Sequence, residues 1–215
     1  GGGGSMALHE SQSRFYENII GRSYEFWKVH YPELKKIFKD ELQDITLEDF
    51  YKHINKSTRS LIRTEADELT YPIHIMIRYD IEKALLKGEV EVKDLPQVWN
   101  QKVKEYLDID VPSDREGVLQ DVHWAGGSFG YFPTYALGSA YAAQIFYVMN
   151  KDFDVLKSLE SKTTKQINAW LKEKLHQYGA SMEPKKLFEN CVNGKFDPKY
   201  YVDYLIQKYS KIYNL

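Results

Sequence analysis

The chain has 215 residues and an apolar fraction of 43%, enough to build the core of one large domain or two small ones. Its formal net charge of −2 argues against a nucleic-acid partner, and it has no run of about 18 apolar residues that would predict a membrane span. The single cysteine, Cys191, excludes an internal disulfide framework and indicates a cytoplasmic protein in which this thiol is a small buried hydrophobe.

The first segment, Gly1–Ser5, has the composition of a flexible engineered linker and is left out of the predicted fold. Apolar residues then recur at helical spacing from Ala7 to Tyr31, and Pro32 is expected to end this helix or to open the next one. Thr46 and the acidic turn that follows it predict a second helix, which we expect to continue to about Ile62.

Helical signals also dominate the rest of the chain. Ser113–Glu116 has the pattern of a capping box that opens the segment 117–138. The alternation at 89–93 predicts a short strand or an extended link. Further helices are expected from Thr70 to a cap at Gly88, and at 94–107, 133–149, 154–159, 163–178, 184–190 and 198–213. The predicted fold class is all-α, with at most a minor β element.

Residues 117–138, GVLQDVHWAGGSFGYFPTYALG, form the most informative segment. Its glycines between 126 and 130 permit backbone angles that other residues avoid. His123, Tyr131 and Tyr135 can donate hydrogen bonds to developing negative charge, and a carboxylate such as Asp121 can orient the histidine ring. The alternative for both tyrosines is a place in the core. Their spacing of four would put them on one helical face if the loop is already helical there.

Glu10 follows His9 on the first predicted helix, but the pair does not complete a zinc motif. The His-Glu-x-x-His pattern needs a second histidine where this chain has Ser13. From the residues alone, Glu10 is more typical of a solvated helix-face charge than of a metal ligand.

Arg63 lies among carboxylates at positions 65, 67 and 68. This cluster is either a weak surface ion-pair network or an arginine held in place so that its planar fork can grip an incoming carboxylate. His74, which stands between isoleucines, is expected to be a histidine packed between helices with its hydrogen bonds satisfied.

Several of these segments, in order, resemble motifs of the carboxypeptidase Taq family of zinc carboxypeptidases. GVLQDVHW matches the family's Gly-x-x-Gln-Asp-x-His-Trp signature, and GGSFGYFPTYALG matches its continuation. HESQSRFYENIIGRS at 9–23 is similar to its His-Glu-Ser-Gln motif, and IRTEADELTYPIH at 62–74 to another block. The tail from PKKLFENCVNGKFDPKYYVDYL at 184–205 is similar to the family's C-terminal end.

This resemblance implies a function and a set of site residues. Glu10 would be the third zinc ligand, Arg63 would hold the free C-terminal carboxylate of a peptide, and His123 with Tyr131 or Tyr135 would bind the substrate and its transition state. The implied fold is a mostly helical, two-lobed, zincin-like clamp around a long groove, usually dimeric. Zinc in the parent enzyme would polarise the scissile carbonyl, and a glutamate would take the proton of its water.

The family's His-Glu-x-x-His motif lies upstream of His-Glu-Ser-Gln, where this chain has glycines. We therefore expect residues 6–215 to be the C-terminal part of a metallocarboxypeptidase catalytic domain, inactive alone and unable to hold zinc by itself. Its expected partners are peptides with a free C-terminus, a second copy of the chain or the missing N-terminal half. The alternative is a non-catalytic helical module that binds peptides or serves as a scaffold.

Overall fold

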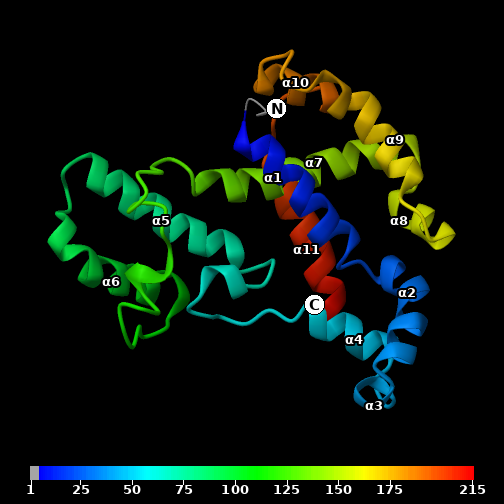
Figure 1. Cartoon of the computed structure of the whole chain (residues 1–215), viewed down its shortest axis with the longest axis horizontal. Helices are drawn as coiled ribbons and strands as arrows, with labels where there is room; N and C mark the ends of the chain where they lie inside the picture. The colour runs from blue at the N-terminus through cyan, green and yellow to red at the C-terminus, as the bar shows by residue number, and fades with distance from the viewer. Residues whose placement is uncertain (1–4) are drawn as a thin grey trace. The chain divides into compact units, whose positions relative to one another are not determined.

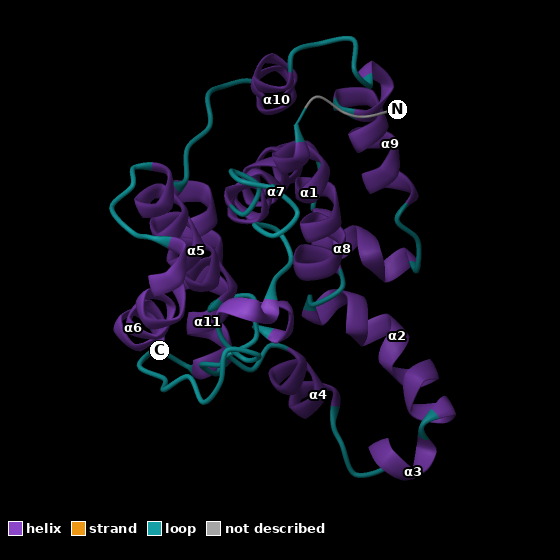
Figure 2. Cartoon of the chain, turned by 60° about the vertical axis from the view of Figure 1, so that its left-hand side comes forward, coloured by secondary structure: helices purple, strands orange, loops and turns teal. Residues whose placement is uncertain are grey.

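A computed structural model describes residues 5–215, and Figure 2 shows that these residues form helices and loops without a strand. The predicted all-α class is confirmed. The strand considered at 89–93 does not form, because the chain makes a single 3-10 turn there, η3 (Val92–Asp94), with Val92 75% exposed. The linker predicted for Gly1–Ser5 lies, apart from Ser5, outside the described residues.

The chain divides into two compact units, which its composition did not indicate. Unit 1 comprises the described residues up to Asn55 together with Leu137–Leu215, and unit 2 is the continuous stretch Lys56–Ala136. The boundary at 136–137 falls inside one helix, α7 (Pro133–Asp152). The helices of each unit can be followed by their labels in Figure 1.

The N-terminal part of unit 1 differs from the predicted single helix over 7–31. The observed elements are α1 (Met6–Arg14), the π-helical η1 (Phe15–Ile20), α2 (Tyr24–Ile37), α3 (Lys39–Leu42) and α4 (Leu47–Ile54). The break comes at 21–23, where the Ser23 hydroxyl caps α2 by accepting a hydrogen bond from the Phe26 amide at 3.2 Å. Pro32 lies inside α2, so the prediction that it separates two helices is wrong. Proline cannot donate a hydrogen bond to the carbonyl four residues before it. Because Pro32 is exposed, that carbonyl can bond water instead.

Helix α4 begins as predicted but ends early. Thr46 and Asp49 form the capping box at its start. The predicted continuation to Ile62 is wrong, because the buried Asn55 ends the helix. Its side-chain amide donates to the Tyr51 carbonyl at 2.9 Å and to the Arg22 carbonyl at 3.1 Å, which fixes the chain where it leaves α4.

The C-terminal part of unit 1 contains α7, α8 (Val155–Ser158), η5 (Leu159–Ser161), α9 (Lys165–Lys174), η6 (His176–Tyr178), α10 (Pro184–Val192) and α11 (Lys199–Tyr213). Apolar faces from most of these elements meet η1 in one core, whose most deeply buried members include Phe15, Ile145, Met149, Ile167 and Leu171. The buried residues of α11, Tyr209 and Ile212, instead form a second cluster with Tyr51 of α4. Cys191 belongs to this core, and burial raises the pKa of its thiol to about 12, as expected for a structural cysteine.

Unit 2 is built around two helices that both match their predictions, α5 (Tyr71–Leu86) and α6 (Leu95–Leu107). Ile77 and Ile81 of α5 pack against Trp99 and Val103 of α6. Two 3-10 turns, η2 (Arg63–Glu65) and η4 (Val118–Gln120), lie on the connecting segments. The capping box expected at Ser113–Glu116 opens no α-helix. The Ser113 hydroxyl bonds only the Glu116 side chain, and the chain passes through turns into η4.

Candidate functional site

The glycine-rich segment of unit 2 forms a closed loop between η4 and α7. The Ser128 amide donates to the His123 carbonyl at 2.8 Å, and the Gly126 amide donates to the Val122 carbonyl at 3.0 Å. Gly127 and Gly130 have φ angles of +75° and +77°, a region in which a side chain would be strained. The glycines are therefore required by the path of the backbone, as the sequence predicted.

The loop brings together the three residues that were predicted to stabilise negative charge. The His123 Nε2 atom lies 3.2 Å from the Tyr135 hydroxyl. The Tyr131 ring centroid lies 5.5 Å from that of His123 and 5.4 Å from that of Tyr135. Tyr131 precedes α7 and Tyr135 lies in its first turn, so the two tyrosines meet across the helix start and not along one helical face.

His123 is held mainly by ring contacts. The Phe132 ring lies 4.2 Å away, and His123 Nδ1 is buried without a hydrogen-bond partner. The nearest oxygen of Asp121 is 3.9 Å from Nδ1, which is too long for a hydrogen bond, so the expectation that Asp121 orients the ring by such a bond is wrong. Burial lowers the pKa of His123, and a neutral imidazole therefore predominates at neutral pH.

The oxygens of Asp121 are occupied by two buried arginines. Arg63 donates to Oδ1 from Nη2 at 2.7 Å and from Nε at 3.1 Å, and Arg78 donates to Oδ2 from Nε at 2.7 Å. The Gln120 side-chain oxygen accepts from the Arg63 amide at 2.9 Å and from Arg78 Nη2 at 2.8 Å. Two adjacent residues of the signature, Gln120 and Asp121, thus tie η2 and α5 together.

Burial and charge together shift the pKa values of Arg63, Arg78 and Asp121. Burial lowers the pKa of Arg78 to about 10, although Asp121 opposes the shift. Burial also opposes ionisation of Arg63 and of Asp121. Their mutual hydrogen bonds and charges outweigh it, so the pKa of Arg63 is raised and that of Asp121 is lowered. All three groups are therefore ionised at neutral pH.

Arg63 is not part of a surface ion-pair network, because it is only 6% exposed. Asp67, one of the nearby carboxylates, instead accepts hydrogen bonds from its own turn and from Ser57. The carboxylate that holds Arg63 is the distant Asp121, and Tyr71 accepts a further bond from Arg63 Nη1 at 3.0 Å. These contacts use three of the five N–H groups of the guanidinium.

Sequence reasoning missed Tyr71, Arg78 and Glu82. The last two share one face of α5 with His74. His74, Arg78 and Glu82 follow at intervals of four in a helix that is otherwise mostly apolar, and all three are buried. His74 is buried as predicted, but the expectation that its hydrogen bonds are satisfied is wrong, because its Nε2 atom has no partner among the described residues. Burial, with Arg78 and Arg63 nearby, lowers its pKa to about 4. A polar stripe on an apolar helix was the available signal, since such a stripe must find partners inside the protein.

Glu10, the predicted zinc ligand, belongs to unit 1, whereas the other predicted site residues belong to unit 2. Its carboxylate accepts a hydrogen bond from Arg14 Nε at 3.0 Å. Catalytic zinc needs three protein ligands, and no group of three or more histidine, cysteine, aspartate or glutamate side chains suited to a metal occurs within 5–215. The donor set of the described residues therefore does not fit a zinc ion.

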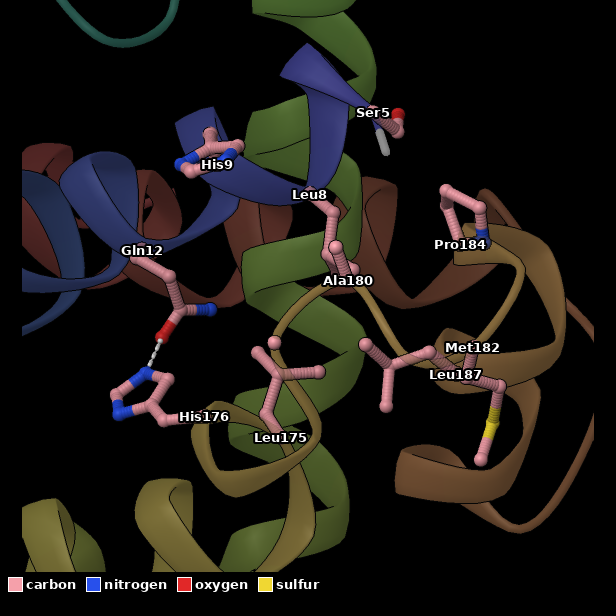
Figure 3. Close-up of a pocket in the computed structure, with 11 residues that line it drawn as sticks. Ser5, Leu8, His9, Gln12, Leu175, His176, Ala180, Met182, Pro184 and Leu187 are labelled. Atoms are coloured by element: carbon pink, nitrogen blue, oxygen red, sulfur yellow. Dashed lines mark hydrogen bonds between the residues drawn. The ribbon is translucent and has the colours of Figure 1, made fainter. Parts of the chain in front are cut away.

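A hollow of about 280 Å³ lies beside the start of α1 in unit 1 (Figure 3). Apolar side chains such as Leu8, Leu175 and Leu187 line it, and His176 Nε2 lies 2.8 Å from the Gln12 side-chain oxygen at its edge. Glu10 is not among its lining residues. None of the predicted site residues therefore contributes to this hollow.

Comparison with known proteins shows one consistent relationship. Residues 1–209 match the family described as carboxypeptidase Taq (M32) metallopeptidase. The chain is 50% identical over 216 residues to carboxypeptidase 1 of Bacillus subtilis, covering 99% of this chain and 43% of the relative. It is 42% identical to thermostable carboxypeptidase 1 of Pyrococcus furiosus, covering 97% of this chain and 42% of the relative.

Solved structures agree. The M32 carboxypeptidase from Deinococcus radiodurans matches with a TM-score of 0.96 at 35% identity, over 100% of this chain and 44% of that one. The crystal structure titled BsuCP matches with a TM-score of 0.92 at 49% identity, over 98% of this chain and 42% of that one. The chain thus spans less than half the length of the relatives that it matches. In the part of the chain that the structure covers, no helix has the length and apolarity needed to cross a membrane.

Proposed function

The chain belongs to the carboxypeptidase Taq (M32) metallopeptidase family, and from that premise we propose that it supplies the substrate-holding part of a zinc carboxypeptidase that releases C-terminal amino acids from peptides. The observation that carries this proposal is the grouping of His123, Tyr131 and Tyr135, with the His123–Tyr135 contact at 3.2 Å. Three side chains able to donate hydrogen bonds meet beside a loop that only glycines can form.

The proposed role of this group is to stabilise the oxyanion that forms when a peptide carbonyl is attacked. Because its pKa is lowered, His123 acts as a neutral hydrogen-bond donor and not as a cation. One donor of this kind typically contributes about 3 kcal/mol to the transition state. Tyr131 or Tyr135 supplies a second donor through its phenolic O–H.

Arg63 is the proposed anchor for the free carboxylate of the substrate. Its guanidinium is fixed by Asp121 at Nε and Nη2 and by Tyr71 at Nη1, so its plane is set before a ligand arrives and two N–H groups remain for that ligand. A fixed planar fork loses little conformational entropy when it binds a carboxylate. This arrangement favours peptides with a free chain end over amidated ones.

Glu10 is proposed as one ligand of the zinc ion of the complete enzyme. A single carboxylate does not hold catalytic zinc, so we propose that this chain by itself binds peptides without hydrolysing them. A peptidase assay with and without added zinc tests this statement, and robust turnover by the isolated chain would refute it. Metal content of the purified protein gives an independent check.

The chain is further proposed to pair with a second copy or with the N-terminal half of the enzyme. Exposed apolar side chains support this, among them Leu119, Val122, Val202 and Ile206. Light scattering is expected to show dimers or larger species. A clean monomer would leave the other half of the enzyme as the proposed partner, to be tested by adding an upstream fragment that contains His-Glu-x-x-His and measuring zinc uptake.

Peptide titrations separate the carboxypeptidase proposal from a generic peptide-binding or scaffold module. We expect a peptide with a free C-terminus to bind at least about tenfold tighter than its amide, because one charge-assisted bidentate contact contributes more than about 1.4 kcal/mol. Arg63→Lys keeps the buried charge but loses the fork, and should remove most of this preference. Arg59→Lys, at an exposed ion pair, is the matched control. Equal affinity for both peptides would favour the generic module.

A further inference from the structure

Glu82 is a buried carboxylate that the proposed chemistry does not use. It lies on α5, four residues after Arg78, and is 4% exposed. Burying a carboxylate costs free energy unless hydrogen bonds compensate it, so the partners of Glu82 indicate why it is there.

Both oxygens of Glu82 accept hydrogen bonds from the glycine-rich loop. Oε1 accepts from the Gly130 amide, and Oε2 accepts from the indole Nε1–H of Trp124 at 3.3 Å. A carboxylate has two acceptor oxygens, so the Glu82 side chain can accept from both donors at once. The partners lie 42 and 48 residues away along the chain, so these bonds fix tertiary structure and not a local turn.

The two anchored positions lie directly beside residues of the proposed site. Trp124 follows His123, and Gly130 precedes Tyr131. Between the two anchors the loop closes on itself through the bond from the Ser128 amide to the His123 carbonyl. One side chain therefore holds both ends of the loop, and each end carries one of the two rings that meet at 5.5 Å.

We propose that Glu82 is a positioning residue that clamps both ends of the 124–130 loop and thereby sets the distance between the His123 and Tyr131 rings. The inference rests on the proposed function only for the consequence that the clamp matters for peptide binding. The clamp itself is a property of the chain, and it can be measured without a substrate.

The decisive variant is Glu82→Gln, studied in the full chain. Glutamine keeps the size of the side chain but turns one acceptor into an NH2 group, which would face one of the two loop donors. We expect the exchange of the Gly130 amide proton or of the Trp124 indole proton with solvent to become at least about tenfold faster. The nuclear Overhauser contacts between the His123 and Tyr131 rings should weaken, and the titration midpoint of His123 should move.

Two comparisons make this result specific. Glu105→Gln, an exposed glutamate on α6 that pairs with Lys102, should change none of these signals. In Glu82→Gln, amide exchange at Val103 in the α6 core should stay as in the unchanged chain, which separates a released loop from general unfolding. If Glu82→Gln loses its helical circular dichroism, Glu82→Asp carries the test. Its side chain is one methylene too short to reach both donors, and faster exchange is expected at one of them.

Peptide affinity then distinguishes the inference from the proposed function. A free-acid peptide should bind Glu82→Gln at least about tenfold more weakly than the unchanged chain, with Glu105→Gln unaffected. Unchanged loop exchange would overturn the inference. A released loop with full peptide affinity would support the clamp and overturn its role in peptide binding. If the unchanged chain binds no free-acid peptide, the proposed function fails, while loop exchange and ring contacts still decide whether Glu82 is the clamp.

Discussion

Different interactions stabilise the interior of each of the two units. Unit 1 has a large apolar core in which helices meet through side chains such as Phe15, Ile145 and Leu171. Unit 2 also has apolar clusters, but its long connecting segments are held by buried charge, with Asp121 between Arg63 and Arg78. An apolar core tolerates exchange of similar side chains, whereas a buried charge network depends on each of its members. The segment that carries the proposed chemistry therefore lies where the structure is most specific and least tolerant.

The largest effect is expected from Asp121→Ala in unit 2. The change leaves two guanidinium groups buried without their common carboxylate, and the free energy of unfolding should fall by about 3–5 kcal/mol. Urea unfolding measures the loss, and amide exchange should locate it in α5. Asp110→Ala, which removes an exposed ion pair with Lys104, should cost no more than about 1 kcal/mol. Equal effects of the two variants would contradict the comparison.

Acid should weaken unit 2 through His74. Burial lowers the pKa of this histidine from 6.5 to about 4, so the folded state disfavours its protonation. The stability that depends on neutral His74 is present above pH 6.5 and is lost as the pH falls from 6.5 to 4, by about 3 kcal/mol in total. The free energy of unfolding, measured with urea between pH 7 and pH 4, should therefore change less with pH in His74→Gln than in the unchanged chain. His53→Gln, at an exposed position, should behave like the unchanged chain.

In unit 1, packing and not charge should set the response, and Gly138→Ala tests this. A Cβ atom at position 138 would lie 2.7 Å from the Glu10 Cβ, so α1 and α7 would have to move apart. We expect a loss of about 1–3 kcal/mol, although alanine is ordinarily the better helix former. Thermal unfolding measures it, with the exposed helical substitution Gln207→Ala as the control. A stabilised Gly138→Ala variant would show that this contact is not tight.

The smallest effect is expected at a helix end. Thr46→Ala removes the hydroxyl that accepts the Asp49 amide at the start of α4, and should cost about 1 kcal/mol. Thr64→Ala, at an exposed threonine of unit 2, should change the free energy of unfolding by less than about 0.5 kcal/mol. Local amide exchange in α4 distinguishes a lost cap from a general effect. A loss as large as that of Asp121→Ala would mean that surface caps weigh as much as the buried network.

Local signals in the sequence predicted most of the helices, because caps and spacing act within a few residues. Thr46, Pro72 and Pro133 each mark a helix start that the structure contains. The predicted helix ends at Pro32 and Ile62 were wrong. The Ser23 hydroxyl places a helix start before Pro32, and the Asn55 side chain ends α4 before Ile62.

The site was predictable in part. The glycines and the rings of His123, Tyr131 and Tyr135 lie within thirteen consecutive residues, so their proximity followed from the sequence. The partner of Arg63 could not be predicted, because Asp121 is 58 residues away and nearer carboxylates were available. Glu82 was not predicted for the same reason, because its partners Trp124 and Gly130 are distant along the chain.

The division of the chain also bears on the order in which it folds during synthesis. Unit 2 is one continuous stretch and is complete once residue 136 has left the ribosome, whereas unit 1 needs residues from both sides of that stretch. Phe15 reaches its place in the core only with Ile145 and Leu171, which are made long after it. The apolar face of η1 therefore gains these core partners only after the segment 56–136 has been made, and an apolar face whose partners are made late is open to aggregation for longer.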